Sequence, residues 1–205
     1  MTDLALEGPS YTWAVDDAPG DLVRRVAAGD HGAWARLVER YNSMVWSIVR
    51  SFRLGPDDAL DAVQTVWLRL VENLEKVKDP DAVGTWLATT ARNECLTHLR
   101  RQGRQAIPVD TSDREMVDVR AVPLDDALLA RERAAALWEA LARVSEPCQQ
   151  LLRILAADPP PSYQEVSMAL NMPTGSIGPT RARCLEKLRL SLVKASNRND
   201  LMGSP

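Results

Sequence analysis

Apolar residues recur three and four positions apart along most of this chain, and this spacing limits the folds that the chain can adopt. One such stripe begins at Trp34 and ends at Phe52, and comparable stripes follow at 59–74, 86–99 and 124–144. Spacing of this kind is typical of amphipathic α-helices. Strand-favouring residues never alternate over a useful length. The sequence therefore predicts an all-α fold.

Glycine, proline and aspartate separate these stripes and divide the chain into two helical units. Gly29-Asp30, 55–58 and 78–81 are expected turns, and a short helix is expected at 21–28. Residues 104–123 lack helical periodicity and contain acids and two prolines, which indicates a linker. The predicted organisation is a disordered extension at 1–20, a four-helix unit at 21–103, a linker at 104–123, a second helical unit at 124–195 and a tail at 196–205.

The chain contains no signal for secretion or membrane insertion. No run of 18 apolar residues occurs, and the N-terminus lacks the basic start and apolar core of a signal peptide. We therefore expect a cytoplasmic protein.

Cysteine and histidine are too scattered to indicate a metal site. Cys95, Cys148 and Cys184 are far apart, no CxxC motif occurs, and the chain has only 2 histidines. We expect no metal, no cofactor and no disulfide, with each cysteine packed as a small apolar residue. No Ser/Cys–His or His–carboxylate arrangement and no glycine-rich phosphate loop is evident, so we expect no catalytic residue.

Charge is unevenly distributed, although the net charge is only −3. Residues 174–194 hold five basic groups against one acid, and 92–104 hold four against one. By contrast, 55–81 and 105–132 each hold seven acids against three basic groups. Phosphate binding depends on the local patch rather than on the total charge. The pattern suggests DNA contacted in two places and a protein partner elsewhere.

Residues 162–189 have the pattern of a helix-turn-helix. The first helix is expected to end at 171–173, since Pro173 disfavours a helical conformation in the residue before it. Ser176 is the predicted N-cap of the second helix, with Pro179 in its first turn. A basic second helix of this kind suits insertion into a major groove. Taken alone, the same pattern also fits an ordinary helix pair with a solvated basic face.

Four sequence blocks occur in an order found in a known family. They are GDHGAWARLVERYNSMVWSIVRSF, DDALDAVQTVWLRL with Asp61 and Gln64 in a D-x-x-Q core, GTWLATTARNECLTHLRR, and SYQEVSMALNMPTGSIGPTRARCLEKLR. In these blocks the chain resembles bacterial RNA polymerase sigma factors of the extracytoplasmic-function (ECF) type, in the sigma-70 group. The resemblance covers residues 21–194.

The resemblance implies a non-enzymatic transcription initiation factor. Its first unit, similar to sigma-70 region 2, would dock on core RNA polymerase and read the −10 promoter element. Its second unit, similar to region 4, would read the −35 element, and the factor would promote DNA melting. The implied partners are core RNA polymerase (its beta and beta-prime subunits), promoter DNA and, as in many family members, an anti-sigma factor. The acids of 105–132 would either mimic nucleic acid in a polymerase channel or form a simple acidic tether.

Three sets of site residues follow from the resemblance. The docking set is Asp57, Asp58, Asp61, Gln64 and Trp67. The −10 set is Asp81, Val83, Thr85, Arg92, Asn93, Arg100 and Arg101. The −35 set is Ser176, Gly178, Pro179, Arg181, Ala182, Arg183 and Lys187. Without the family context, the acids would be helix caps on a solvated face.

An alternative function is a helix-turn-helix repressor or activator whose N-terminal unit dimerises or senses a ligand. An acidic docking face together with two separate basic patches argues against this alternative. A plain repressor needs only one DNA-binding patch per subunit.

Overall fold

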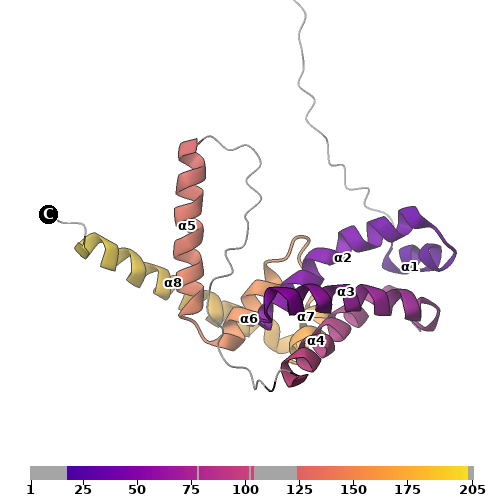
Figure 1. Cartoon of the computed structure of the whole chain (residues 1–205). Coiled ribbons are helices and arrows are strands. Elements are labelled where there is room, and N and C mark those ends of the chain that lie inside the picture. The colour runs from indigo at the N-terminus through magenta and orange to yellow at the C-terminus, as the bar shows by residue number, and fades with distance from the viewer. Residues whose placement is uncertain (1–17, 78, 102, 104–123, 203–205) are drawn as a thin grey trace, which may run out of the picture.

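The computed structural model describes residues 18–77, 79–101, 103 and 124–202, with the backbone alone described for 76, 124–132 and 195–202. All regular structure in these residues is helical, which confirms the predicted all-α fold (Figure 1). Its elements are α1 (Pro19–Ala27), α2 (His31–Ser51), α3 (Pro56–Asn73), the 3-10 turns η1 (Leu74–Lys76) and η2 (Pro80–Ala82), α4 (Val83–Arg101), α5 (Leu124–Ala142), α6 (Glu146–Leu155), α7 (Tyr163–Leu170) and α8 (Thr174–Met202). The predicted linker at 104–123 lies outside the described residues. Among the described helices, none is long and apolar enough to cross a membrane.

The first helices begin and end where local chemistry requires it. Gly29 has a φ of 87° and ends α1, because a residue without a side chain adopts this conformation at little cost. Asp30 then caps α2 and accepts a hydrogen bond of 3.0 Å from the backbone N–H of Ala33. At the start of α3, Pro56 lies in the first turn, where its missing N–H is not needed.

The helices α7 and α8 are joined by a short turn at 171–173. Ser162 and Glu165 form a capping box at the start of α7, and Asn171 ends this helix in the left-handed conformation. The predicted N-cap at Ser176 is wrong, because α8 already begins at Thr174. Pro179 therefore lies inside the helix rather than in its first turn, one turn after the exposed Gly175.

The helix α8 also runs further than expected. It continues to Met202, through most of the predicted tail. From Arg181 to Met202 the sequence contains neither glycine nor proline, so nothing in it ends the helix before Gly203.

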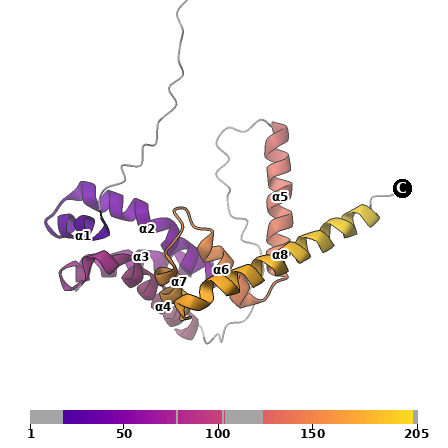
Figure 2. The same ribbon diagram turned by 180° about the vertical axis from the view of Figure 1, so that it is seen from behind.

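The two helical units share one hydrophobic core. The cluster of buried residues runs from Leu22 in α1 to Cys184 in α8. In both Figure 1 and Figure 2, α6 and α7 lie against the bundle of α2, α3 and α4, and α5 and the C-terminal part of α8 project from this body. The helix α4 packs along α7, and α2 packs along α6. The chain thus adopts a closed arrangement, in which the second unit covers part of the first.

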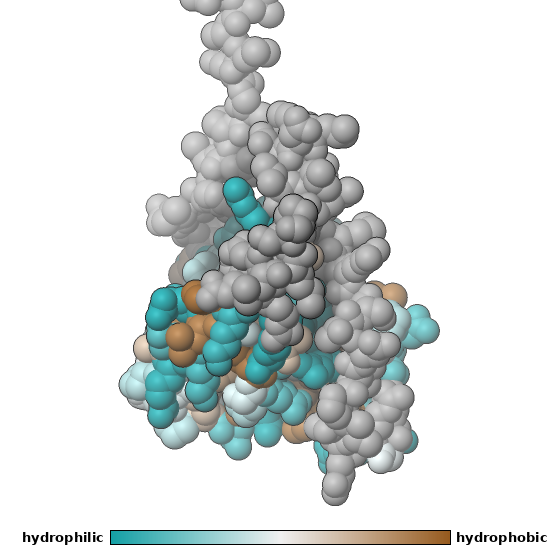
Figure 3. Space-filling model, turned by 90° about the vertical axis from the view of Figure 1, so that its left-hand side faces the viewer, coloured by the Kyte–Doolittle hydropathy of each residue, from teal (hydrophilic) through white to brown (hydrophobic). Residues whose placement is uncertain are grey.

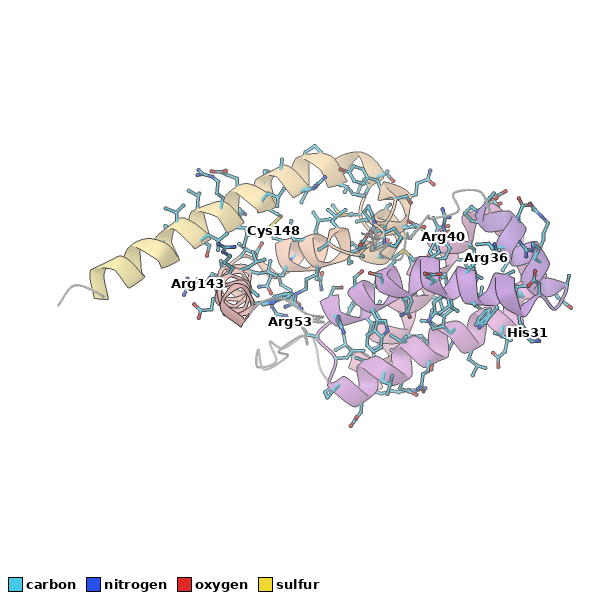
Figure 4. All side chains as sticks on the ribbon, turned by 90° about the horizontal axis from the view of Figure 1, so that it is seen from above. His31, Arg36, Arg40, Arg53, Arg143 and Cys148 are labelled. Atoms are coloured by element: carbon cyan, nitrogen blue, oxygen red, sulfur yellow. A yellow bond between two sulfur atoms is a disulfide. The ribbon has the colours of Figure 1, made fainter. Side chains whose placement is uncertain are left out.

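Two polar contacts and one close approach join the two units. Arg53, which follows α2, donates a hydrogen bond to the Gln149 side chain at the start of α6, and Figure 4 shows Arg53 directed toward the second unit. The backbone N–H of Asp158 donates to Ser43 Oγ at 3.1 Å. At Gly84, a Cβ atom would lie only 1.8 Å from Glu165 Oε1 of α7, so the first turn of α4 approaches α7 closely.

Candidate nucleic-acid and protein interface

A histidine of α4 contacts two carboxylates of the acidic face of α3. The side chain of His98 is 9% exposed, and its Nδ1 lies 3.3 Å from Asp58 Oδ1. Its Nε2 lies 3.3 Å from Asp61 Oδ2. Asp57 is exposed at the first turn of the same helix. The structure therefore brings the three predicted acids together and adds His98, which the sequence did not indicate because only the packing of α4 on α3 reveals it.

Apolar side chains extend this acidic face along α3. Leu60, Leu68 and Val71 are 47%, 57% and 52% exposed. Leu68 and Val71 therefore both lie on the outer side of the helix. Gln64 is exposed beside them, whereas Trp67 packs edge-on against Trp34, with ring centroids 5.8 Å apart. Of the five predicted docking residues, Trp67 is the one directed inward.

Two members of the predicted −10 set face the protein. Val83 is fully buried at the start of α4. The Asp81 carboxylate accepts a hydrogen bond of 3.0 Å from the backbone N–H of Gly20, at the N-terminus of α1. A carboxylate at that position stabilises the helix end. In this arrangement, Asp81 and Val83 hold η2 and α4 against α1 and the core.

The remaining members of this set lie along α4. Asn93, Arg100 and Arg101 are exposed, and Arg92 is partly exposed. Arg100 Nε donates to the Leu96 carbonyl at 3.0 Å, which keeps this side chain along its own helix. The Thr85 hydroxyl donates to the Ala82 carbonyl at 2.8 Å and is thus engaged at the helix start. A basic surface suited to phosphate contacts therefore follows the C-terminal half of α4.

The predicted −35 residues lie on the first four turns of α8. Pro179, Arg181, Ala182, Arg183 and Lys187 are exposed, while Ser176 and Gly178 are partly exposed. The guanidinium group of Arg183 donates to Thr180 Oγ1 at 3.1 Å, a contact within the exposed helix surface. Ile177 and Cys184 are buried on the opposite side. The helix thus presents one face to solvent and packs with the other.

A basic groove continues this face of α8. It has a volume of about 410 Å³ and is lined by Arg143, Val144, Ser145, Lys187, Leu190, Ser191 and Lys194. Positions 183, 187, 190 and 194 are spaced by three and four, so they share one side of the helix. Seen from the α5–α8 side, the described surface is mostly hydrophilic, with apolar spots between (Figure 3). Arg143 and Lys194 were not among the predicted site residues, because only folding brings 143–145 beside α8.

The expectation of no disulfide is wrong for two of the three cysteines. Cys148 of α6 and Cys184 of α8 are joined by a disulfide, with their Cα atoms 5.3 Å apart. Figure 4 places Cys148 near the junction of α5 and α6. Cys95 is a free, buried thiol, and burial in the core raises its pKa to about 12. Cys95 therefore matches its expected role as a small apolar residue.

Comparisons with known proteins agree with this architecture. Residues 37–105 match the sigma-70 region 2 family. The ECF RNA polymerase sigma-E factor of Haemophilus influenzae is 24% identical over 163 residues, 76% of this chain and 85% of the relative. The sigma-E factor of Escherichia coli strain K12 is 25% identical over 166 residues, 76% of this chain and 84% of the relative.

A solved structure has the same fold. It is the structure of CnrH in complex with the cytosolic domain of CnrY, which is 21% identical and has a TM-score of 0.56 over 87% of this chain and 99% of CnrH. The region 2 match spans most of α2 and all of α3 and α4, and α3 and α4 form the acidic face and one basic surface. Residues 37–105 thus belong to the sigma-70 region 2 family, and the chain as a whole is similar to RNA polymerase sigma factors of the extracytoplasmic-function group.

Proposed function

We propose that this protein binds core RNA polymerase, recognises the −35 and −10 elements of a promoter, and promotes melting of the DNA for transcription initiation. The observation that carries the proposal is the separation of three surfaces: an acidic face on α3, a basic surface on α4 and a basic surface on α8. A factor that joins a polymerase to two promoter elements needs these three surfaces. The polymerase supplies the nucleotidyl-transfer chemistry, and this chain supplies binding.

The docking surface is proposed as Asp57, Asp58, Asp61 and Gln64, with Leu60, Leu68 and Val71 beside them. Exposed apolar side chains bordered by charges are typical of protein interfaces. The His98 contacts hold two of the carboxylates in place before the partner arrives, which reduces the entropy lost on binding. The partner surface is expected to be basic.

For the −10 element, we propose that Arg92, Asn93, Arg100 and Arg101 carry the DNA contacts. Arginines along one helix neutralise phosphates, and the Asn93 amide suits a base edge. Asp81, Val83 and Thr85 contribute indirectly, because they fix the start of α4 against α1.

For the −35 element, we propose that the exposed face of α8 enters the major groove. Arg183 is the base-reading donor, since Gly178, Pro179 and Ala182 have no long polar side chain. Arg181 and Lys187 position the helix by contacts to phosphates. With few direct base contacts available, part of the selectivity is expected to come from DNA shape.

Promoter binding requires the closed arrangement to open. The two elements lie about 25 base pairs apart by their numbering, or roughly 85 Å at 3.4 Å per base pair. The helix α4 has 19 residues and is therefore only about 28 Å long. Because α7 packs along α4, the two DNA-binding surfaces are too close to reach both elements at once. We propose that polymerase binding separates the two units, which remain joined through 104–123.

A protein partner that favours the closed form is also part of this proposal. It is supported by the fold shared with CnrH, which was solved in complex with the cytosolic domain of CnrY. A partner of this kind would act as an anti-sigma factor, since it would withhold the docking face or prevent separation of the units.

The test is promoter selection from a random DNA library by core polymerase reconstituted with this chain. We expect two enriched sequence blocks at a fixed spacing, and no such pair with core polymerase alone. Enrichment of a single block by the chain without polymerase would contradict the proposal and support the repressor or activator function instead.

The variant Arg183→Ala is expected to weaken binding to the selected −35 duplex by roughly 1–3 kcal/mol, because a bidentate contact to a base is lost. Fluorescence anisotropy on the selected duplex and on a scrambled one measures the effect. The expected loss is specific to the selected sequence. An equal loss on both duplexes would reduce Arg183 to a phosphate contact.

The double variant Lys187→Ala/Lys194→Ala tests the basic groove of α8. We expect the salt dependence of −35 binding, log Kd against log salt concentration, to become shallower by about 0.9 for each phosphate contact removed. Arg24→Ala/Arg40→Ala removes the same charge from α1 and α2 and is the matched control. If the lysine double variant leaves the salt-dependence slope unchanged, or if the arginine control changes it equally, the phosphate-binding role is contradicted.

A further inference from the structure

The disulfide between Cys148 and Cys184 lies within the part of the chain that is proposed to read DNA. Cys184 directly follows Arg183 on α8, and Cys148 lies in the first turn of α6. The two cysteines are 36 positions apart, and the loop that they close contains all of α7 and the turn at 171–173. The bond therefore ties the proposed recognition helix to the helix on which it packs.

The same bond connects α8 to the junction between the two units. Gln149, next to Cys148, is buried and donates to the Val144 carbonyl at 2.8 Å, which closes the turn between α5 and α6. Its side-chain oxygen accepts the hydrogen bond from Arg53 of the first unit. Breaking the bond at Cys148 would thus affect both the position of α8 and the Arg53–Gln149 hydrogen bond between the two units.

Two observations, together with the proposed function, favour reversible thiol chemistry at this pair. The Cα–Cα distance of 5.3 Å falls within the range of natural disulfides. Both cysteines are small and apolar when reduced, and their sites, 5% and 1% exposed, accept either form. A protein that works with RNA polymerase on DNA meets a thiol-reducing compartment, where disulfides are rare and usually serve redox sensing.

We propose that the Cys148–Cys184 pair is a redox site that controls −35 recognition, with the disulfide form as the tighter DNA binder. The inference rests on the proposed function. In the disulfide form, α8 is fixed on α6, so less conformational freedom is lost when the helix enters the groove. In the dithiol form, α7 and α8 are held only by packing, and DNA binding is weaker.

The reaction is an exchange with a small or protein dithiol. A thiolate of the reductant attacks one cysteine sulfur, the Cys148–Cys184 bond breaks, and the other cysteine leaves as a thiolate that takes up a proton. The second thiol of the reductant then attacks the mixed disulfide and releases the first cysteine. Overall, the protein gains two electrons and two protons, and the reductant becomes a disulfide. Cys95 takes no part, since it is buried in α4 and unpaired.

The experiment compares the oxidised and the reduced full-length chain. Each form is prepared in a buffer with a defined ratio of reduced to oxidised dithiothreitol. Free thiols are counted by alkylation and mass spectrometry. Binding to the selected −35 duplex is measured by anisotropy, and thermal unfolding is followed in parallel. We expect one alkylated thiol in the oxidised form and three in the reduced form. Reduction should weaken −35 binding several-fold and lower the Tm by roughly 10 °C.

Variants separate the redox site from general effects of the buffer. Cys148→Ser/Cys184→Ser should bind as the reduced chain does in every buffer, and Cys95→Ser should respond as the wild-type chain does. If the double variant fails to fold, chemical reduction of the wild-type chain still decides the question.

Equal DNA affinity of the two forms, with thiol counts of one and three, would overturn the inference and leave the proposed function intact. Three free thiols in the most oxidising buffer would overturn it as well. Failure of both forms to prefer the selected duplex over a scrambled one would instead overturn the proposed function, and the inference with it.

Discussion

Asp61→Arg is expected to weaken binding to core RNA polymerase by about 2 kcal/mol or more, a loss of roughly thirtyfold in affinity. Asp61 is the most exposed of the two carboxylates that His98 contacts, with 64% of its side chain exposed. An arginine there would place a positive charge against a partner expected to be basic, and it would remove the carboxylate that lies against His98 Nε2. The loss is measured by titrating core polymerase into fluorescently labelled chain.

Glu39→Arg is the control for Asp61→Arg. Glu39 is an exposed acid of α2, so its replacement changes the net charge by the same amount away from the docking face. We expect Glu39→Arg to bind polymerase as the wild-type chain does, and both variants to keep −35 binding. Unchanged polymerase affinity for Asp61→Arg, or an equal loss for the control, would exclude the acidic face of α3 as the docking site.

Gly84→Ala is expected to destabilise the closed form by roughly 1–3 kcal/mol, the usual range for an overpacked core. The added methyl group would lie 1.8 Å from Glu165 Oε1 and 2.9 Å from Tyr41 Cε1. Glu165 must then leave its 2.6 Å hydrogen bond with the Ser162 N–H, and the buried Tyr41 ring must move. We expect a lower Tm and, in small-angle X-ray scattering, a larger radius of gyration as α7 separates from α4.

Gly175→Ala is the matched change at an open position. Nothing lies within 4 Å of a Cβ at Gly175, and this residue is in the first turn of α8. Alanine favours the helix over glycine, so we expect unchanged or slightly higher stability and an unchanged radius of gyration. If Gly84→Ala keeps the wild-type Tm and radius, α4 does not pack against α7 in solution as described.

The helices could be predicted from the sequence because their signals are local. Apolar spacing identified the stripes of α2, α3 and α4, and Gly29, Asp30 and Pro56 marked their boundaries. The apolar spacing did not reveal that α4 also packs against α7, in addition to α2 and α3. Gly84 gives no apolar signal, although its missing side chain is what permits close contact with α7. The closed arrangement therefore depends on long-range packing, which no local pattern encodes.

The candidate site was predictable where a residue type alone sets the chemistry. Acids on α3 and arginines on α4 and α8 are exposed because their charge requires water. Residue type alone does not predict which positions at the start of α4 are buried. Val83 was therefore assigned to the DNA-binding set although it lies in the core. His98 and the Cys148–Cys184 pair were missed for a related reason. Each acts through a partner on another helix, and the sequence contains no signal for that pairing.

The most direct test of the central claim is run-off transcription with purified core polymerase on a pool of genomic promoters, with and without this chain. We expect discrete new start sites that appear only with the chain and that share two upstream elements. We also expect Asp61→Arg to abolish these starts and Glu39→Arg to preserve them. Absence of new starts from an active core polymerase, with DNA binding by the chain intact, would contradict the assignment as a promoter-specificity factor.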